Sequence, residues 1–261
     1  MNKRISFRQS VLLGFGGLIL FIGLWHGLAI SGLVPRVFLP SPLEVYDRFT
    51  TLLDRRFAGA TLLGHMLASF ERFAYGFILA AVVGIPLGLL MGWYRLLDEI
   101  VSPLFDALRF VAPIAWVPFA ALWFGTGIGG PIMIIFAGAF PPCVINAYRG
   151  AKFVDPRLIE AANMLGTPSH RVIREVLVPS SVPSIISGLR VSAGLGWQSL
   201  VGAELIVASA GVGYLMVQGQ ANISTTTVMS GMVAIGLVGL ALDSSLRLAE
   251  RVILRKRGLE N

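Results

Sequence analysis

Charged residues are scarce in this chain of 261 residues: Asp, Glu, Lys and Arg make up 13% of it, whereas a soluble domain carries roughly 25%. So few charges cannot cover the water-facing surface of a protein of this size. The chain has one cysteine, Cys143, which excludes a disulfide-rich secreted scaffold. Three histidines without an H-E-x-x-H sequence exclude a zinc protease, and the G-x-S-x-G elbow of a serine hydrolase is also missing.

Lysine is equally rare. Only Lys3, Lys152 and Lys256 occur, and none of them follows a glycine. A phosphate-binding loop needs the sequence G-x-x-x-x-G-K, so this chain has no such loop with which to hydrolyse ATP. No constellation of catalytic or metal-ligating residues emerges, and we expect neither an enzyme nor a bound metal or cofactor.

Apolar residues are abundant instead, at 55% of the chain, and the mean hydropathy is +0.77. These values predict an all-α polytopic membrane protein, because a spanning helix needs about 20 mostly apolar residues. The first apolar run is longer than the 7–15 residues of a signal peptide, which favours an uncleaved first helix. Six such stretches are present: 11–31, 73–93, 103–124, 131–148, 188–209 and 228–246.

The net charge of +7 is best explained by membrane topology, because lysine and arginine concentrate in cytoplasmic segments. Most of them fall on one side when both tails, 1–10 and 247–261, are placed in the cytoplasm. The segment 32–72 then lies outside. The lipid bilayer is therefore the expected surroundings, and no nucleic-acid partner is needed to explain the basic charge.

Within that outer segment, Ser41-Pro42-Leu43-Glu44 has the pattern of a helix start with a capping box. It predicts a short helix over 42–56, with its apolar residues on one face. Two interpretations are open: a helix lying in the membrane interface, or a helix packed on the outer ends of the bundle. The rest of the segment, up to residue 72, contains the start of the second membrane helix.

The inner segment 150–183 is too polar to span a membrane and too regular to be a linker. Asp155-Pro156 starts a first helix that stops near Gly166, and Thr167-Pro168 starts a second that ends near Pro179. Small residues at the bend let another protein approach the backbone closely. We interpret this segment as a docking loop.

Its residues resemble the EAA loop of ABC-transporter importer permeases. The matching positions, at the family's spacing, are Glu160, Ala161, Ala162, Gly166, Val176, Val178 and Pro179. Two of them depart from the pattern, since valine replaces isoleucine at 176 and leucine at 178, and both changes keep an aliphatic side chain. The resemblance implies that Glu160, Ala161, Ala162, Gly166 and Pro179 couple the chain to a separate ATPase.

Other motifs are similar to those of the nitrate, sulfonate and taurine permease group. They are Leu39–Pro42, Gly84–Gly88, Pro113–Pro118, Trp123–Gly125, Gly196-Trp197, Ala203-Glu204 and Gly211–Tyr214. The likeness covers roughly residues 35–250, as one permease domain. It implies a bacterial inner-membrane homodimer that receives a small anion from an external binding protein. It also implies two cytoplasmic ATPase subunits, which bind ATP and Mg²⁺.

Proline interrupts the third and fourth spans, and broken helices often line translocation paths. We expect the path among the third, fourth and fifth spans, although kinked helices with a purely structural role would show the same prolines. Glu204 has two readings, as a structural residue or as part of an outer gate. The candidate path residues are Arg109, Pro113, Trp116, Pro118, Asn146, Trp197, Gln198 and Glu204.

Two alternatives remain open from the sequence. The same architecture could carry a different solute, such as a thiamine-precursor pyrimidine, a riboflavin-like compound, bicarbonate or an aromatic acid. A channel or carrier without an ATPase would need no docking loop at all.

Overall fold

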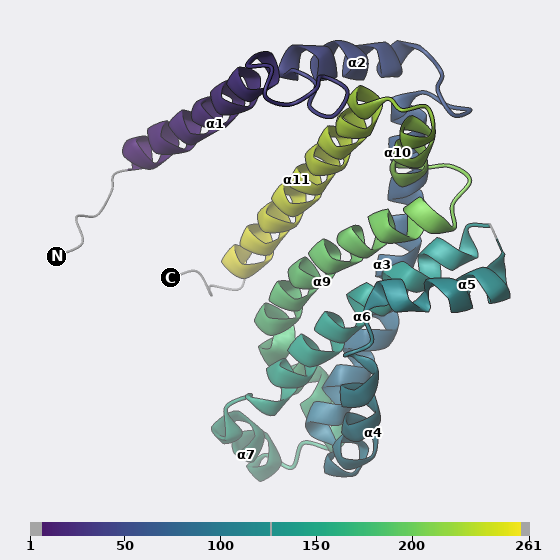
Figure 1. Cartoon of the computed structure of the whole chain (residues 1–261). Helices are drawn as coiled ribbons and strands as arrows, with labels where there is room; N and C mark the ends of the chain where they lie inside the picture. The colour runs from purple at the N-terminus through teal and green to yellow at the C-terminus, as the bar shows by residue number, and fades with distance from the viewer. Residues whose placement is uncertain (1–6, 126, 257–261) are drawn as a thin grey trace.

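The computed structural model describes residues 7–125 and 127–256, which fold almost wholly into helices (Figure 1). In these ranges the sole β-type pairing is an isolated bridge between Phe57 and Ala60. The all-helical class is therefore confirmed. In chain order the elements are α1 (Phe7–Ile30), α2 (Pro42–Asp54), α3 (Leu62–Trp93), α4 (Arg95–Leu108), η1 (Pro113–Trp116), α5 (Val117–Phe124), α6 (Gly129–Lys152), α7 (Pro156–Met164), α8 (Ser169–Val172), η2 (Ile173–Leu177), α9 (Val178–Ile206), α10 (Val212–Ala221) and α11 (Thr225–Lys256).

Five helical stretches are long and apolar enough to cross a membrane, and a sixth span results if α4 and η1–α5 count as one. The first, second, fourth and sixth expected spans fall on α1, α3, α6 and α11. Helix α1 already begins at Phe7 and α11 continues to Lys256, so parts of the expected tails are helical. Residues 1–6 and 257–261 of those tails lie outside the described residues.

The third expected span, 103–124, is broken, as its prolines predicted. Helix α4 and the η1–α5 segment meet at an angle of 85°. The break falls at Ala112, which has φ −56° and ψ 138° because it precedes Pro113. A residue before proline is pushed out of the α region by contact with the proline ring, so the helix cannot pass this point. The proline pair Pro141-Pro142, in contrast, lies inside an unbroken α6.

We expected the second helix of the 150–183 loop to end near Pro179, but it continues beyond that residue. Helix α8, a π-helical turn (η2) and α9 run on as one helical stretch from Ser169 to Ile206. In the π-helical turn, the N–H of Val178 donates to the carbonyl of Ile173, five residues back. This wider turn changes the hydrogen-bond register just ahead of Pro179, and the helix continues through the proline.

Helices α3, α6 and α9 form the core and pack closely through glycine. A Cβ added at Gly88 of α3 would lie 2.3 Å from the carbonyl oxygen of Val144 in α6, and one at Gly188 of α9 would lie 2.4 Å from the Cβ of Asn146. Only glycine permits such close approach of two helices in the membrane. Small residues recur every four positions in the second and fifth spans, and their glycines serve helix packing: Gly84, Gly88 and Gly92 in α3, and Gly188 and Gly196 in α9.

The two ends of the molecule differ in structure (Figure 1). Helix α2 lies across one end, and α7 lies at the opposite end. The capping box is confirmed, with the Ser41 N–H donating to Glu44 Oε2 at 2.7 Å. Helix α2 packs on the bundle, where it buries Val45 and Leu52, while α1 extends away from the other helices. Below, we call these the α2 end and the α7 end.

Candidate functional site: a cavity beside the broken helix

A cavity of about 610 Å³ lies between the broken helix, α6 and α9. The segment between α4 and η1 contributes Arg109, Phe110 and Val111, so the break itself forms one wall. Of the expected path residues, the cavity brings together Arg109, Pro113, Asn146 and Gln198. The full lining is Arg109, Phe110, Val111, Pro113, Ile114, Ala137, Gly138, Pro141, Pro142, Ile145, Asn146, Arg149, Val191, Leu195, Gln198, Ser199 and Gly202.

The charge of this lining is positive. Arg109 and Arg149 line the cavity, and no Asp or Glu belongs to the lining among the described residues. Arg109 donates from Nε to Asp106 at 2.8 Å, as the i, i+3 spacing indicates, and its guanidinium lies 4.7 Å from the Phe110 ring centre. Arg149 is exposed on the last turns of α6 and forms no ion pair within the described chain. Arg149 was not among the path residues expected from the sequence.

Neutral polar groups complete the wall. The Asn146 side chain donates from Nδ2 to the Pro142 carbonyl at 2.9 Å, and the Gln198 side chain is exposed on α9. Pro141 and Pro142 have no N–H, so the carbonyls of Ala137 and Gly138, four residues earlier, lose their helical donors. Both residues line the cavity, and carbonyls freed by proline are tolerated in a membrane helix that borders a cavity.

A second, apolar pocket of about 210 Å³ adjoins the first. It contains Trp116, which the sequence placed on the path. Its walls are Phe105, Leu108, Arg109, Val111, Trp116, Met133, Phe136, Ala137, Phe140 and Pro141.

Three other expected path residues lie elsewhere. Pro118 is exposed on α5 and lines neither pocket. Trp197 is buried, with its Nε1 donating to the Ile235 carbonyl at 3.2 Å and its ring edge-on to Phe73. Glu204 is 2% exposed and faces α3, away from both pockets.

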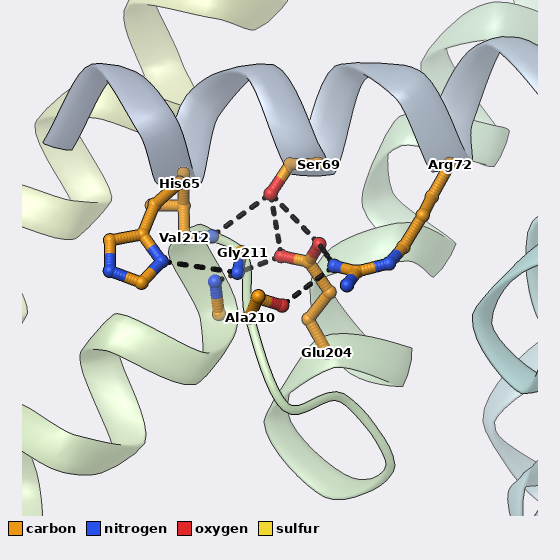
Figure 2. Close-up of polar contacts among 8 residues, drawn as sticks. His65, Ser69, Arg72, Glu204, Ala210, Gly211 and Val212 are labelled. Carbon is orange, nitrogen blue, oxygen red and sulfur yellow. Dashed lines mark hydrogen bonds and ion pairs between the residues drawn. The ribbon is translucent and has the colours of Figure 1, made fainter. Parts of the chain in front are cut away.

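Glu204 instead belongs to a buried polar cluster that joins α9, α3 and α10, here called the clasp (Figure 2). Its carboxylate accepts hydrogen bonds from Arg72 at 2.9 Å, from the Ser69 hydroxyl at 2.8 Å and from the Gly213 N–H at 3.0 Å. Arg72 also donates to the Ala210 carbonyl at 2.6 Å. The carboxylate is therefore neutralised and held from three sides.

His65 extends the clasp to the turn before α10. Its Nδ1 accepts from the Gly211 N–H at 3.2 Å, and its Nε2 lies 2.9 Å from the Phe57 carbonyl. Gly211 has φ +112°, and a Cβ there would lie 2.1 Å from the Glu204 carboxylate, so only glycine fits. The sequence held one usable signal: positions 65, 69 and 72 share one helical face, a polar stripe on an otherwise apolar span.

The loop at the α7 end contains the residues of the EAA pattern. Asp155 caps α7, with its carboxylate accepting from the Arg157 N–H at 3.0 Å. Gly166 ends α7 with φ +72°, a left-handed conformation that glycine adopts without strain. Glu160 and Ala161 are exposed, Ala162 is partly buried, and Pro179 lies partly buried on the first turn of α9.

Two large apolar side chains at the end of α7 were not singled out from the sequence. Met164 is 87% exposed and Leu165 is 85% exposed. They lie on a polar, basic segment, so the surrounding lipid does not explain their exposure. No group of three or more His, Cys, Asp or Glu residues that could hold a metal occurs in the described parts of the chain.

The family model described as "Binding-protein-dependent transport system inner membrane component" matches residues 84–258. The chain belongs to this family. The permease is 35% identical to a putative aliphatic sulfonates transport permease of Bacillus subtilis, over 98% of this chain and 90% of that protein. It is 32% identical to the taurine transport system permease of Escherichia coli, over 96% and 93%. It is 31% identical to a bicarbonate transport system permease of Synechococcus elongatus, over 95% and 91%.

The fold agrees with this assignment. An inward-facing structure of the MetNI methionine ABC transporter matches 82% of the permease and 99% of that chain, with a TM-score of 0.53 and 20% identity. The permease is thus a multi-pass membrane subunit of an ABC importer, of the nitrate, sulfonate and taurine type. It is a transport subunit and not an enzyme, since ATP hydrolysis belongs to the partner ATPase.

Proposed function

We propose that this permease imports a small anion of the sulfonate, taurine or nitrate class, delivered by an external binding protein. The taurine and sulfonate relatives support the solute class. The cavity supports it independently, because two arginines line it without an acidic residue among the described lining. Two copies of the permease enclose the path, and two ATPase subunits, with their ATP and Mg²⁺, drive the transport.

The observation that carries the coupling role is the unpartnered end of α7. Met164 and Leu165 project from it, exposed to more than four fifths of their surface, and Glu160 is exposed on the same helix. Burial of one such apolar side chain in a partner is worth about 1.5–3 kcal/mol. The ATPase accordingly docks here, with α7 entering a groove on its surface and Glu160 orienting the contact.

We infer the membrane orientation from this docking. The α7 end faces the cytoplasm, and the α2 end faces outward to the binding protein. Positive charge supports this arrangement, since Arg149, Lys152, Arg157, Arg171 and Arg174 all lie in or next to the α7 end. Both termini then lie on the cytoplasmic side of a bacterial inner membrane.

The test is co-purification of the ATPase with tagged permease variants, followed by ATP-driven taurine and alkylsulfonate uptake into proteoliposomes. We expect Leu165→Asp and Glu160→Lys to lose the ATPase and at least about tenfold of the uptake. A bulky residue at Gly166, such as Val, should uncouple transport as well, because its φ of +72° disfavours any β-branched side chain.

Ile223→Asp is the matched control. Ile223 is an apolar residue 79% exposed, between α10 and α11 at the end opposite α7 (Figure 1). Its positive φ is tolerated by aspartate. This variant should keep the ATPase. Full coupled uptake by Leu165→Asp and Glu160→Lys would refute the coupling role, and solute flux without any ATPase would favour a channel or carrier.

The second candidate solute is bicarbonate, because one relative is a bicarbonate transport system permease. The same proteoliposomes loaded with the matching binding protein separate the two. Uptake of labelled bicarbonate without uptake of sulfonates would replace the proposed solute class and leave the importer role intact.

A further inference from the structure

We propose that the cavity and the adjoining apolar pocket form one two-part solute site, selective for an organic anion that carries an apolar substituent. The solute is an alkyl- or arylsulfonate-like molecule in preference to an inorganic oxyanion or a zwitterion. This inference rests on the proposed function, because it places the solute in the path of the importer. It adds selectivity within the permease itself.

The larger cavity supplies the anion half. Arg149 is exposed and has no acidic partner among the described residues. Arg109 binds Asp106 through Nε, which leaves its two terminal nitrogens for another acceptor. Guanidinium groups remain protonated at all physiological pH values and present a planar fork of donors to an oxyanion. Gln198 adds a neutral donor on the facing helix.

The smaller pocket supplies the apolar half. Among the described residues that line this pocket, Arg109 is the one charged residue. The other lining residues include Trp116, Met133 and three phenylalanines. Phe136 stacks on Phe140 with ring centres 4.9 Å apart, which gives the pocket a flat aromatic wall. Its volume of about 210 Å³ exceeds the about 150 Å³ of an apolar cavity that holds benzene. A phenyl group or short alkyl chain therefore fits.

The two halves are continuous. Arg109, Val111, Ala137 and Pro141 line both, so an anionic head held at the arginines can place its tail among the aromatic rings. Neither lining contains Asp or Glu within the described residues, and the neighbouring carboxylate of Asp106 is already paired with Arg109. The ammonium group of a zwitterion would therefore have no free counter-ion there. An inorganic oxyanion would leave the apolar half unused.

The experiment measures solute binding to purified wild-type permease in lipid nanodiscs, without its ATPase, by calorimetry and by intrinsic tryptophan fluorescence, to which Trp116 contributes. The probes are methanesulfonate, hexanesulfonate, benzenesulfonate, taurine and nitrate. We expect hexanesulfonate and benzenesulfonate to bind at least about tenfold more tightly than methanesulfonate, because each buried methylene adds about 0.8 kcal/mol. Taurine and nitrate should bind no better than methanesulfonate.

Three variants assign the two halves. Arg149→Gln should weaken all sulfonates by a similar factor. Phe136→Ala should lower the ratio of hexanesulfonate affinity to methanesulfonate affinity. Ala137→Leu narrows the passage between the halves, so it should also reduce the preference for long tails. Because this variant fills space, its result does not depend on a cavity-forming change that could destabilise α6.

The outcomes separate the site from the transport role. Equal affinity for all tail lengths in wild type, or an unchanged preference in Ala137→Leu, would overturn the two-part site even where coupled sulfonate uptake persists. Graded binding that the variants abolish, together with absent coupled uptake, would support the site and refute the proposed function. Graded binding and a matching order of uptake rates would support both.

Discussion

The clasp allows the sharpest test of the structure, because its partners can be removed one at a time. Glu204→Leu takes away the acceptor of Arg72, Ser69 and Gly213, and Arg72 keeps only the Ala210 carbonyl. An uncompensated buried charge costs about 3–5 kcal/mol. At about 2–4 °C per kcal/mol for a chain of this size, we expect the unfolding midpoint to fall by about 6–20 °C.

The double variant Arg72→Met/Glu204→Leu should regain more than half of that loss. It removes both charges, and an apolar pair of similar volume can replace a buried ion pair at little cost. The Ser69 hydroxyl and the Gly213 N–H still lack an acceptor, which leaves a penalty of about 1–3 kcal/mol. The non-additivity of the two substitutions measures the coupling between them.

The assay uses the single cysteine of the chain. Cys143 is 2% exposed, so a thiol-reactive fluorogenic dye labels it only as the permease unfolds during heating in mild detergent. Glu99→Gln is the control, because the Arg95–Glu99 pair is exposed and worth about 0–1 kcal/mol. If the double variant unfolds at the same temperature as Glu204→Leu, the clasp is not held by its ion pair and the reasoning fails.

Two further results are expected. Gly88→Leu should lower the same midpoint by several degrees, since its Cβ would meet the Val144 carbonyl at 2.3 Å, whereas Gly14→Leu on α1, with nothing within 4 Å, should not change it. The Ser41 backbone N–H holds the pKa of Glu44 below its ordinary value. The Glu44 carboxylate therefore stabilises α2 at pH values above its pKa in the unfolded chain, and this stabilisation is lost as the pH falls through its pKa in the folded chain. Hydrogen exchange over residues 42–54 should show this loss in wild type and not in Glu44→Gln.

Most of the architecture could be predicted from the sequence, because a helix that spans a membrane must be long and mostly apolar. Long apolar runs located the helices, and local chemistry located two helix starts, at Ser41 and at Asp155. The predictions that failed, at Pro141-Pro142 and at Pro179, both concern helices that contain proline. The rule that proline disfavours a helical conformation in the residue before it correctly predicts a break at Pro113. The same rule does not show that α6 remains unbroken at Pro141, or that a π-helical turn lets the helix continue past Pro179.

The site was predictable only in part, because its members meet through tertiary packing. Arg109, Asn146 and Gln198 reach one cavity from three separate stretches, as the choice of spans anticipated. Glu204 was judged by its depth along one helix, and no single-sequence pattern shows that Arg72 faces it from 132 positions away. Met164 and Leu165 read as ordinary helix residues until the structure shows that nothing in the described chain covers them.

The chain forms one long helical run from α8 to Ile206, which includes the π-helical turn and Pro183. Its α9 part alone has 29 residues, or about 43 Å at 1.5 Å per residue. The docking loop lies at one end of this run and Gln198 lies along its length. The hydrogen bonds of Glu204 hold the other end to α3 and to the first turn of α10. If the ATPase docks at this loop as proposed, a force applied there would turn the helix about the clasp and would move the cavity wall to which Gln198 belongs.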